Sequence, residues 1–309
     1  MLSNIPSTVI YIFLDGIGIG TSNKEINPLA RYKTYFLSVL GGKSSFSPPG
    51  NLITTDAHMG VKGIPQSATG QTALFTGINA AKVMKRHING FPTFSLRPYL
   101  KKHSILKKFI ENNYKGTLIN SYSSKYLTKI KMPRGERFMS ATTMIQKGSG
   151  LPFFTIEDYL EGKCLYMDIT NWFLKQQGLN INLVKPKTAG RKLVSLSKNY
   201  NLIIYEYFFT DKAGHDGSFV DAKKIISHLE GFFEGIWEEI DTENSLIIIT
   251  SDHGNFEDFS YLNHTENPVA TIFYGKGSEY LQKIKYIYDI PRLILKMFNI
   301  NFSEKNLID

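Results

Sequence analysis

Cysteine is nearly absent from this 309-residue sequence, which contains Cys164 and no other. A single cysteine excludes an intramolecular disulfide and a metal site built from several thiolates, so Cys164 is expected to be a small buried residue. Long apolar runs are also missing. The longest, residues 9–14 and 246–249, are strand-sized and far shorter than the roughly 20 residues that span a bilayer. The sequence therefore predicts no transmembrane helix and no membrane partner.

A concentrated charge pattern is missing as well. The net charge is +9, but the lysines are spread along the chain and no nucleic-acid-binding motif accompanies them. We therefore expect a solvated basic surface and no nucleic-acid partner. The first residues lack the basic and apolar segments of a secretory signal, so the cytoplasm is the expected location.

What the sequence does contain is a regular alternation of apolar segments. Strand patterns cover residues 8–14, 116–120, 201–209, 245–250 and 269–274, and helical patterns cover residues 71–83, 104–113, 189–198, 219–240 and 289–298. Strands that alternate with helices predict an α/β fold, with a mainly parallel central sheet and helices on both faces. We expect one domain over residues 1–309. The periodicity weakens over residues 124–186, which we interpret as an irregular insertion or at most a small cap.

Polar residues follow several of these apolar segments, at the places where an α/β protein collects its chemistry. One group contains carboxylates and imidazoles together with a serine: Asp15, Ser67, Asp211, His215, Asp252, His253 and His264. This order and spacing suit a two-metal phosphoryl-transfer site.

The histidines carry most of that interpretation. Asp211 and His215 are four residues apart, so their side chains share one side of the chain if it coils there. Asp252 and His253 follow a strand directly, and His264 lies in the loop before the next strand. Each histidine taken alone is more often a surface or satisfied buried residue. Three of the seven histidines and three aspartates at strand ends of one sheet instead indicate metal binding by carboxylate and imidazole ligands.

Ser67 adds a group that a plain metal site does not need. It precedes a helical segment, where free backbone N–H groups and the helix dipole favour an anion. Capping the helix is the more ordinary role for a serine at this position.

At this point the sequence resembles the alkaline phosphatase superfamily, over nearly its full length. The run from Ser67 to Gly77, with a Thr-Gly pair ten residues after the serine, is similar to the nucleophile helix of that superfamily. Asp15 matches its first metal-binding aspartate. The segments Thr210-Asp-Lys-Ala-Gly-His215, Asp252-His-Gly-Asn255 and His264-Thr-Glu-Asn-Pro-Val269 resemble metal motifs of cofactor-independent phosphoglycerate mutase and phosphopentomutase.

The resemblance implies two divalent ions, zinc or manganese, with Ser67 as the nucleophile that forms a phosphoseryl intermediate. It assigns the ligands of the first ion as Asp211, His215 and His264, and those of the second as Asp15, Ser67, Asp252 and His253. The implied substrate is a small phosphate ester.

Two departures separate the sequence from the mutases. Gln71 stands where the mutases have a histidine near the nucleophile, and the large second domain that they insert after it is missing here. A mutase must shield its intermediate from water, so the missing lid favours a metal-dependent phosphohydrolase. The alternatives are a phosphomutase and a non-catalytic protein that binds a phosphate ligand through metal. A sulfatase is disfavoured because the segment after Ser67 is not a formylglycine motif.

Substrate contacts are harder to assign from the sequence. The segment from Arg86 to Asn89 resembles the one in which nucleotide pyrophosphatases place a phosphate-binding asparagine. Asn89 and Arg86 are the candidate substrate contacts, although Asn89 before Gly90 is equally typical of a turn and a solvated surface role is the more ordinary one for Arg86. Thr69 is an alternative nucleophile that lacks the ten-residue spacing to Gly77.

Overall fold

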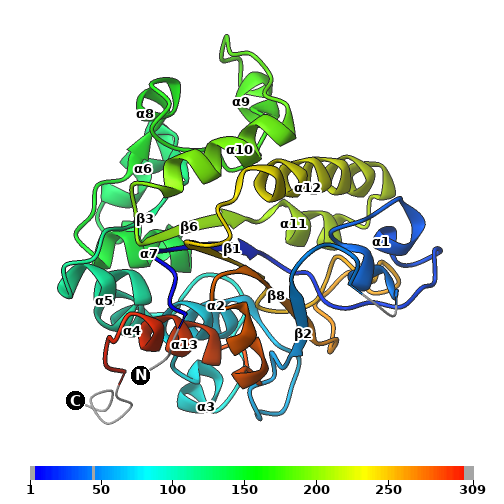
Figure 1. Cartoon of the computed structure of the whole chain (residues 1–309), viewed down its shortest axis with the longest axis horizontal. Helices are drawn as coiled ribbons and strands as arrows, with labels where there is room; N and C mark the ends of the chain where they lie inside the picture. The colour runs from blue at the N-terminus through cyan, green and yellow to red at the C-terminus, as the bar shows by residue number, and fades with distance from the viewer. Residues whose placement is uncertain (1–3, 44–45, 303–309) are drawn as a thin grey trace.

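The computed structural model describes residues 4–43 and 46–302, and in this part of the chain the main sheet has six strands in the order β2-β8-β7-β1-β6-β3 (Figure 1). Neighbouring strands are parallel from β3 through β6 and β1 to β7, whereas β8 is antiparallel to both β7 and β2. The prediction of an α/β fold with a mainly parallel sheet is confirmed. The strands are β1 Thr8–Leu14, β2 Asn51–Thr55, β3 Gly116–Leu118, β6 Leu202–Tyr207, β7 Ser245–Thr250 and β8 Val269–Gly275.

Strand β1 lies at the centre of this sheet and is buried along its whole length. Successive side chains of a strand point to opposite faces, so β1 contributes to two separate cores. Tyr11 and Phe13 pack into the core on one face, and Ile10 and Ile12 into the core on the other. The continuous apolar run at residues 9–14 is therefore explained by helices on both sides of the strand.

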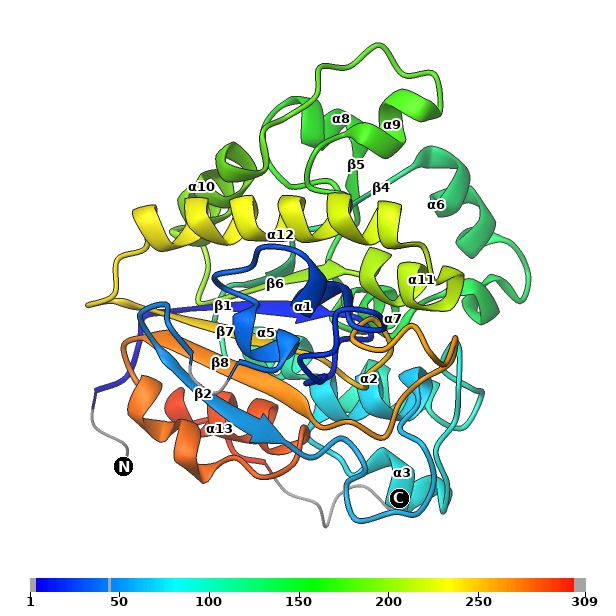
Figure 2. The same ribbon diagram turned by 90° about the vertical axis from the view of Figure 1, so that its right-hand side faces the viewer.

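The two helical layers are visible in Figures 1 and 2, where α10 and α12 lie above the sheet and α2 and α13 below it. The Tyr11 face carries α2 Ser67–Thr76, α4 Arg97–His103, α5 Ile105–Glu111, α7 Ala141–Gly148 and α13 Asp289–Met297. The Ile10 face carries α1 Pro28–Arg31, α10 Pro186–Ser197, α11 Phe209–Asp216 and α12 Phe219–Glu239. The remaining short elements are η1 Ser38–Gly41, α3 Ala80–Met84, β4 Ser121–Tyr122, α6 Ser124–Lys131, η2 Gly135–Phe138, β5 Phe154–Thr155, α8 Ile156–Leu160, α9 Trp172–Gln176 and η3 Ser278–Lys283.

The helix predicted over residues 71–83 is wrong in its bounds. Helix α2 begins at Ser67 and ends at Thr76, because Gly77 adopts a left-handed conformation with φ of 76° and closes the last turn. A second helix, α3, starts after Asn79, whose side chain accepts a hydrogen bond from Lys82 N.

The segment over residues 124–186 is more regular than its weak periodicity predicts. Helix α7 is mostly buried and packs in the same core as α2 and α5, so it belongs to the layer beneath the sheet. Helices α8 and α9 stand apart at the top of the molecule, beyond α10 (Figure 1). Whether this outer part acts as a cap stays a prediction.

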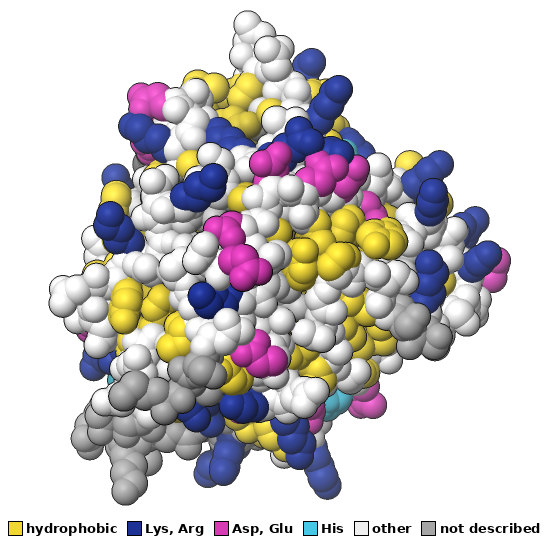
Figure 3. All heavy atoms as spheres, in the orientation of Figure 1, with side chains coloured by type: hydrophobic (Ala, Val, Ile, Leu, Met, Phe, Trp, Pro, Cys, Tyr) yellow, Lys and Arg dark blue, Asp and Glu magenta, His cyan; other side chains and the backbone are white. Residues whose placement is uncertain are grey.

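Among the described residues, no helix combines the length and apolar character needed to cross a membrane. The face drawn in Figure 3 carries lysine and arginine side chains that are scattered rather than gathered in one stripe, as the sequence predicts. The cytoplasmic location stays a prediction.

Candidate metal centre

The residues singled out in the sequence meet at one edge of the sheet. Asp15 follows β1, Asp211 lies in α11 just after β6, and Asp252 follows β7. These parallel strands end at the same edge, which is where ligands bind in α/β sheets. His264 reaches the same edge because β8 is antiparallel to β7, so the loop between them starts and ends there.

Asp211 lies between two of the histidines. Its Oδ2 is 3.5 Å from His215 Nε2, and its Oδ1 is 3.5 Å from His264 Nε2. The first pair shares one side of the chain because α11 is helical there, as the four-residue spacing requires. Asn255 Nδ2 donates a hydrogen bond of 2.8 Å to Asp211 Oδ1 and holds the carboxylate in place.

A second group forms around the His253 ring, whose Nε2 lies 3.6 Å from Asp15 Oδ1 and 3.4 Å from Asp252 Oδ2. Ser67 Oγ is 3.0 Å from the same nitrogen. The structure thus brings together Asp15, Ser67, Asp252 and His253, the set that the resemblance assigns to the second ion.

Ser67 does not cap its helix. The cap position of α2 is Gln66, and Ser67 is the first helical residue, with its hydroxyl directed to His253. The more ordinary role considered for this serine is therefore excluded. The expectation of free N–H groups here is wrong in part, because the N–H groups of Ala68 and Thr69 bond to the Ile88 carbonyl. Thr69, the alternative nucleophile, is fully buried, and its hydroxyl bonds to backbone groups of Gln66 and Ile88.

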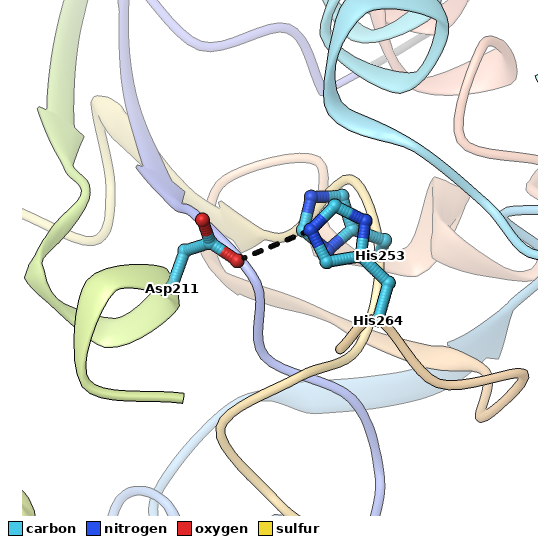
Figure 4. A group of neighbouring side chains, drawn as sticks. All are labelled: Asp211, His253 and His264. Atoms are coloured by element: carbon cyan, nitrogen blue, oxygen red, sulfur yellow. Dashed lines mark ion pairs between the residues drawn. The ribbon is translucent and has the colours of Figure 1, made fainter. Parts of the chain in front are cut away.

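The two groups touch each other through their imidazoles. The His253 and His264 rings stack with centroids 3.7 Å apart, and Figure 4 shows Asp211 pointing toward this pair. Asp211, His253 and His264 each offer a ligand atom within 4.8 Å of the others, and so do Asp15, Asp252 and His253. His253 thus stands at the junction of two potential cation sites.

Burial shapes the charge of this centre. Desolvation and then the neighbouring Asp252 and Asp211 raise the pKa of Asp15, while desolvation followed by Asp211 raises the pKa of Asp252 to about 7. Desolvation also lowers the pKa of His253, and it lowers that of His264 to about 4 with a smaller effect from His253. Both imidazoles are therefore neutral near pH 7, the state in which histidine binds a metal.

Three buried ligand atoms of the centre lack any hydrogen-bond partner in the described structure: Asp15 Oδ1, Asp252 Oδ2 and His264 Nε2. Buried polar atoms are normally paired, so an unpaired group of this kind needs an explanation. Oxygen and imidazole nitrogen atoms facing one another fit divalent cations such as zinc or manganese. The side chains present therefore suit the implied metal.

Sequence reasoning missed the residues that hold the ligands in position. Glu257 is buried and accepts hydrogen bonds from the backbone of Gly18 and Asn255 and from the side chains of Thr265 and Asn267. The last two belong to the segment after His264, so Glu257 fixes the loop that carries this histidine. Gln71 Nε2 donates to Asp15 Oδ2 at 3.2 Å. Glycine at position 70 allows close packing, because a Cβ there would lie 2.9 Å from the Asp252 carbonyl oxygen.

A cavity of ≈ 640 Å³ opens beside this centre. Asp15, Ser67, Asp211 and His215 line it on one side. Gly90 and Phe91 line it as well, whereas the predicted substrate residues Arg86 and Asn89 do not. Asn89 Oδ1 instead accepts a hydrogen bond from Gly90 N, as in the turn considered for it. Substrate contact by Arg86 and Asn89 stays a prediction that the cavity does not support.

Comparison with known proteins shows what this chain is similar to. Residues 172–302 match the model of the Metalloenzyme superfamily. The 2,3-bisphosphoglycerate-independent phosphoglycerate mutase of Ehrlichia canis is 25% identical over 222 residues, which cover 69% of this chain and 43% of the mutase. This chain thus spans less than half the length of that relative.

Solved structures share the fold. Alkaline phosphatase from the Antarctic bacterium TAB5 superimposes with a TM-score of 0.53 and 18% identity, covering 97% of this chain and 99% of the phosphatase. Phosphoglycerate mutase from Leishmania mexicana, crystallised at low cobalt concentration, gives a TM-score of 0.51 and 12% identity, with 98% of each chain covered. At these identities the similarity concerns the architecture alone.

Proposed function

We propose that this chain is a metalloenzyme of the alkaline phosphatase superfamily and, from that premise, a phosphohydrolase that cleaves a small phosphate ester through Ser67. Membership in this superfamily implies divalent metal ions. Their number, two, and their identity as zinc or manganese are part of the proposal.

One observation carries the proposal. The Ser67 hydroxyl is not used to cap α2 but lies 3.0 Å from His253 Nε2, beside Asp15 and Asp252 and open to the cavity. A serine that lines a cavity and is surrounded by potential metal ligands with unpaired atoms supports the proposal that Ser67 is the nucleophile.

The chain's own residues have separate roles in the proposed reaction. Asp211, His215 and His264 would hold one ion, and Asp15, Ser67, Asp252 and His253 the other. Bound divalent ions lower the pKa of a coordinated hydroxyl and neutralise negative charge on a phosphoryl group. The Ser67 Oγ forms the new bond to phosphorus as the ester oxygen leaves, which gives a phosphoserine. Water then attacks the same phosphorus, so phosphate leaves and the serine hydroxyl is restored.

A phosphomutase is the second candidate, and the name of the Ehrlichia canis relative favours it. In that case a hydroxyl of the retained substrate, rather than water, takes the phosphoryl group from Ser67. Two features favour hydrolysis: Gln71 replaces the histidine of the mutases, and the segment after Ser67 continues into helices of the core, α2, α4 and α5, rather than into a large inserted domain. A retained substrate needs shielding from water, which that domain would provide.

The two candidates differ in their products. We would incubate the protein with Mn²⁺ or Zn²⁺ and a panel of phosphomonoesters, phosphodiesters and sugar phosphates, and then measure inorganic phosphate and positional isomers by ³¹P NMR. Phosphate release that disappears in Ser67→Ala supports the hydrolase. Isomer formation without phosphate supports the mutase. Unchanged release in the variant, or no reaction with metal bound, contradicts both.

A further inference from the structure

The cavity beside the metal centre has a second wall that phosphoryl transfer does not require. We call it the aromatic wall and define it as Tyr122, Tyr126, Tyr166, Phe173 and Phe208, all of which line the cavity. A volume of ≈ 640 Å³ lies within the roughly 300–1,000 Å³ range of sites that enclose a small organic ligand. The cavity therefore has room for a leaving group as well as for the phosphate.

The polar atoms of this wall are largely turned away from a ligand. Tyr122 and Tyr126 stack on each other, with ring centroids 5.4 Å apart, and both hydroxyls lie 3.2 Å from Thr143 Oγ1. The Ser121 hydroxyl donates to the Leu165 carbonyl, and the Ser123 hydroxyl caps α6. What remains for a ligand is mainly aromatic surface, which favours a planar or apolar group.

One carboxyl interrupts this surface. Glu206 lies at the end of β6, is 8% exposed and lines the cavity. Thr142 Oγ1 donates to its Oε2 at 2.6 Å, and no residue that the structure describes donates to its Oε1. Asn120 fixes the backbone of Glu206 through hydrogen bonds to both its N–H and its carbonyl. A buried acceptor with an unused oxygen is suited to a hydrogen-bond donor on a ligand.

The carboxyl and the tyrosines are held by one chain of hydroxyls. Thr142 Oγ1 lies 2.7 Å from Ser140 Oγ, which lies 3.0 Å from Thr143 Oγ1, the atom that both tyrosine hydroxyls contact. Side chains fixed in this way lose little conformational freedom when a ligand binds. The arrangement is thus a prepared recognition site rather than a flexible surface.

Charge limits what this site accepts. Lys212 is the one lysine or arginine among the described cavity-lining residues, and it lies at the exposed side of α11. Asp216 adds negative charge, and Glu206, whose pKa burial raises to about 7, adds part of a charge near neutral pH. A leaving group with its own carboxylate or second phosphate would meet these carboxylates without several cations to balance it. An uncharged group with a donor is favoured instead.

We propose that the aromatic wall and Glu206 bind the leaving group of the phosphate ester, and that this group is an uncharged aromatic moiety carrying a hydroxyl or amino hydrogen-bond donor. Both a nucleoside and a phenol have this chemistry. The inference rests on the proposed phosphoryl transfer at Ser67, since it names the substrate class of that same site.

The test compares esters that share the phosphate and differ in the leaving group. Adenosine 5′-monophosphate and 3-hydroxyphenyl phosphate carry the ring and the donor, phenyl phosphate lacks the donor, and 3-phosphoglycerate carries a second anion. We expect kcat/KM with Mn²⁺ to be at least about 10-fold higher for one of the first two than for 3-phosphoglycerate. A higher kcat/KM for adenosine 5′-monophosphate indicates a nucleoside leaving group, and a higher kcat/KM for 3-hydroxyphenyl phosphate indicates a phenol.

Glu206→Gln tests the carboxyl directly. The amide retains the shape of the side chain. When the amide oxygen accepts the hydrogen bond from Thr142, the amide NH₂ takes the place of Oε1, so a donor replaces the acceptor that faces the ligand. We expect the preference for 3-hydroxyphenyl phosphate over phenyl phosphate to fall about 10-fold, mainly through KM, as for loss of a hydrogen bond to a charged group. Glu161→Gln, at an exposed glutamate after α8, is the matched control and should leave the preference unchanged. An unchanged preference in Glu206→Gln, or 3-phosphoglycerate as the best substrate, overturns the inference.

Binding of the leaving group alone separates this inference from the proposed function. Adenosine and resorcinol are titrated into Ser67→Ala by NMR. If either compound binds and Glu206→Gln weakens that binding, the inference is supported. If no ester is turned over in that case, only the proposed function fails. Turnover without binding or preference for either ring contradicts the inference and leaves the function standing.

Discussion

The two walls of the cavity differ in how the chain builds them. The polar wall, which we define as the cavity-lining residues Asp15, Ser67, Asp211 and His215 together with the other residues of the metal centre, Asp252, His253 and His264, sits where strands of the main sheet end or where helices follow them. The aromatic wall and Glu206 come mostly from β4, α6, α9 and the segments between them, with only the end of β6 shared. In the proposed account, reaction chemistry thus lies at the sheet edge, and recognition lies on peripheral segments.

If this division is right, changes in the polar wall should affect kcat. In Asp252→Asn, a buried carboxylate of the centre becomes an amide of the same shape. We expect phosphate release to fall roughly 10²–10³-fold, because charge stabilisation at the reacting phosphoryl group is weakened. Steady-state kinetics and metal analysis of the purified variant check this, with bound metal expected to fall from two ions to about one. A variant with full activity and two ions would remove Asp252 from the centre.

Metal binding to the polar wall should depend on pH, which is not expected of the aromatic wall. The pKa of Asp252 is raised to about 7, so below that pH the carboxyl holds a proton that must leave before a cation binds. The pKa of His264 is about 4, so this imidazole is already neutral between pH 6 and 8. We expect the apparent affinity for Mn²⁺ to fall by up to about 10-fold per unit as pH drops below 7.

Melting temperatures measured across a Mn²⁺ titration at pH 6 and pH 8 test this expectation. The stabilisation at a fixed subsaturating concentration should be larger at pH 8. Equal stabilisation at the two pH values would show that no carboxyl of the centre gives up a proton on binding.

Changes on the recognition side should instead affect KM, and by less. Phe91 lines the cavity and is 56% exposed, so Phe91→Ala removes an aromatic contact without opening the core. We expect KM for an aryl phosphate to rise about 3- to 10-fold, with kcat within about 2-fold. Phe94→Ala is the matched control, since Phe94 is 84% exposed and does not line the cavity. Equal effects of the two variants on KM would contradict a role of Phe91 in binding the substrate.

The same division explains what could be predicted from the sequence. Strands β1 and β7 can be recognised in the sequence because burial on both faces leaves continuous apolar runs that end in polar residues. The i, i+4 spacing of Asp211 and His215 also predicts their shared side, since it depends only on local coiling.

Other features depend on contacts between distant segments. The sequence pattern does not reveal strand β2, because it is an edge strand with a mixed polar pattern, NLITT, that pairs with β8 alone among the described strands. Glu206 has no local signal, because its role arises from Thr142 and Asn120, which are 64 and 86 residues away in sequence. Arg86 and Asn89 were chosen from a local pattern, and tertiary structure places Gly90 and Phe91 at the cavity instead.

The most direct test of the central claim is to look for the phosphorylated serine. The protein with Mn²⁺ and a turned-over phosphate ester is quenched in acid within the first turnovers, digested and analysed by peptide mass spectrometry. The account predicts metal-dependent phosphate on Ser67, absent from Ser67→Ala. Turnover with no phosphopeptide, or with phosphate on Thr69 or elsewhere, would contradict it.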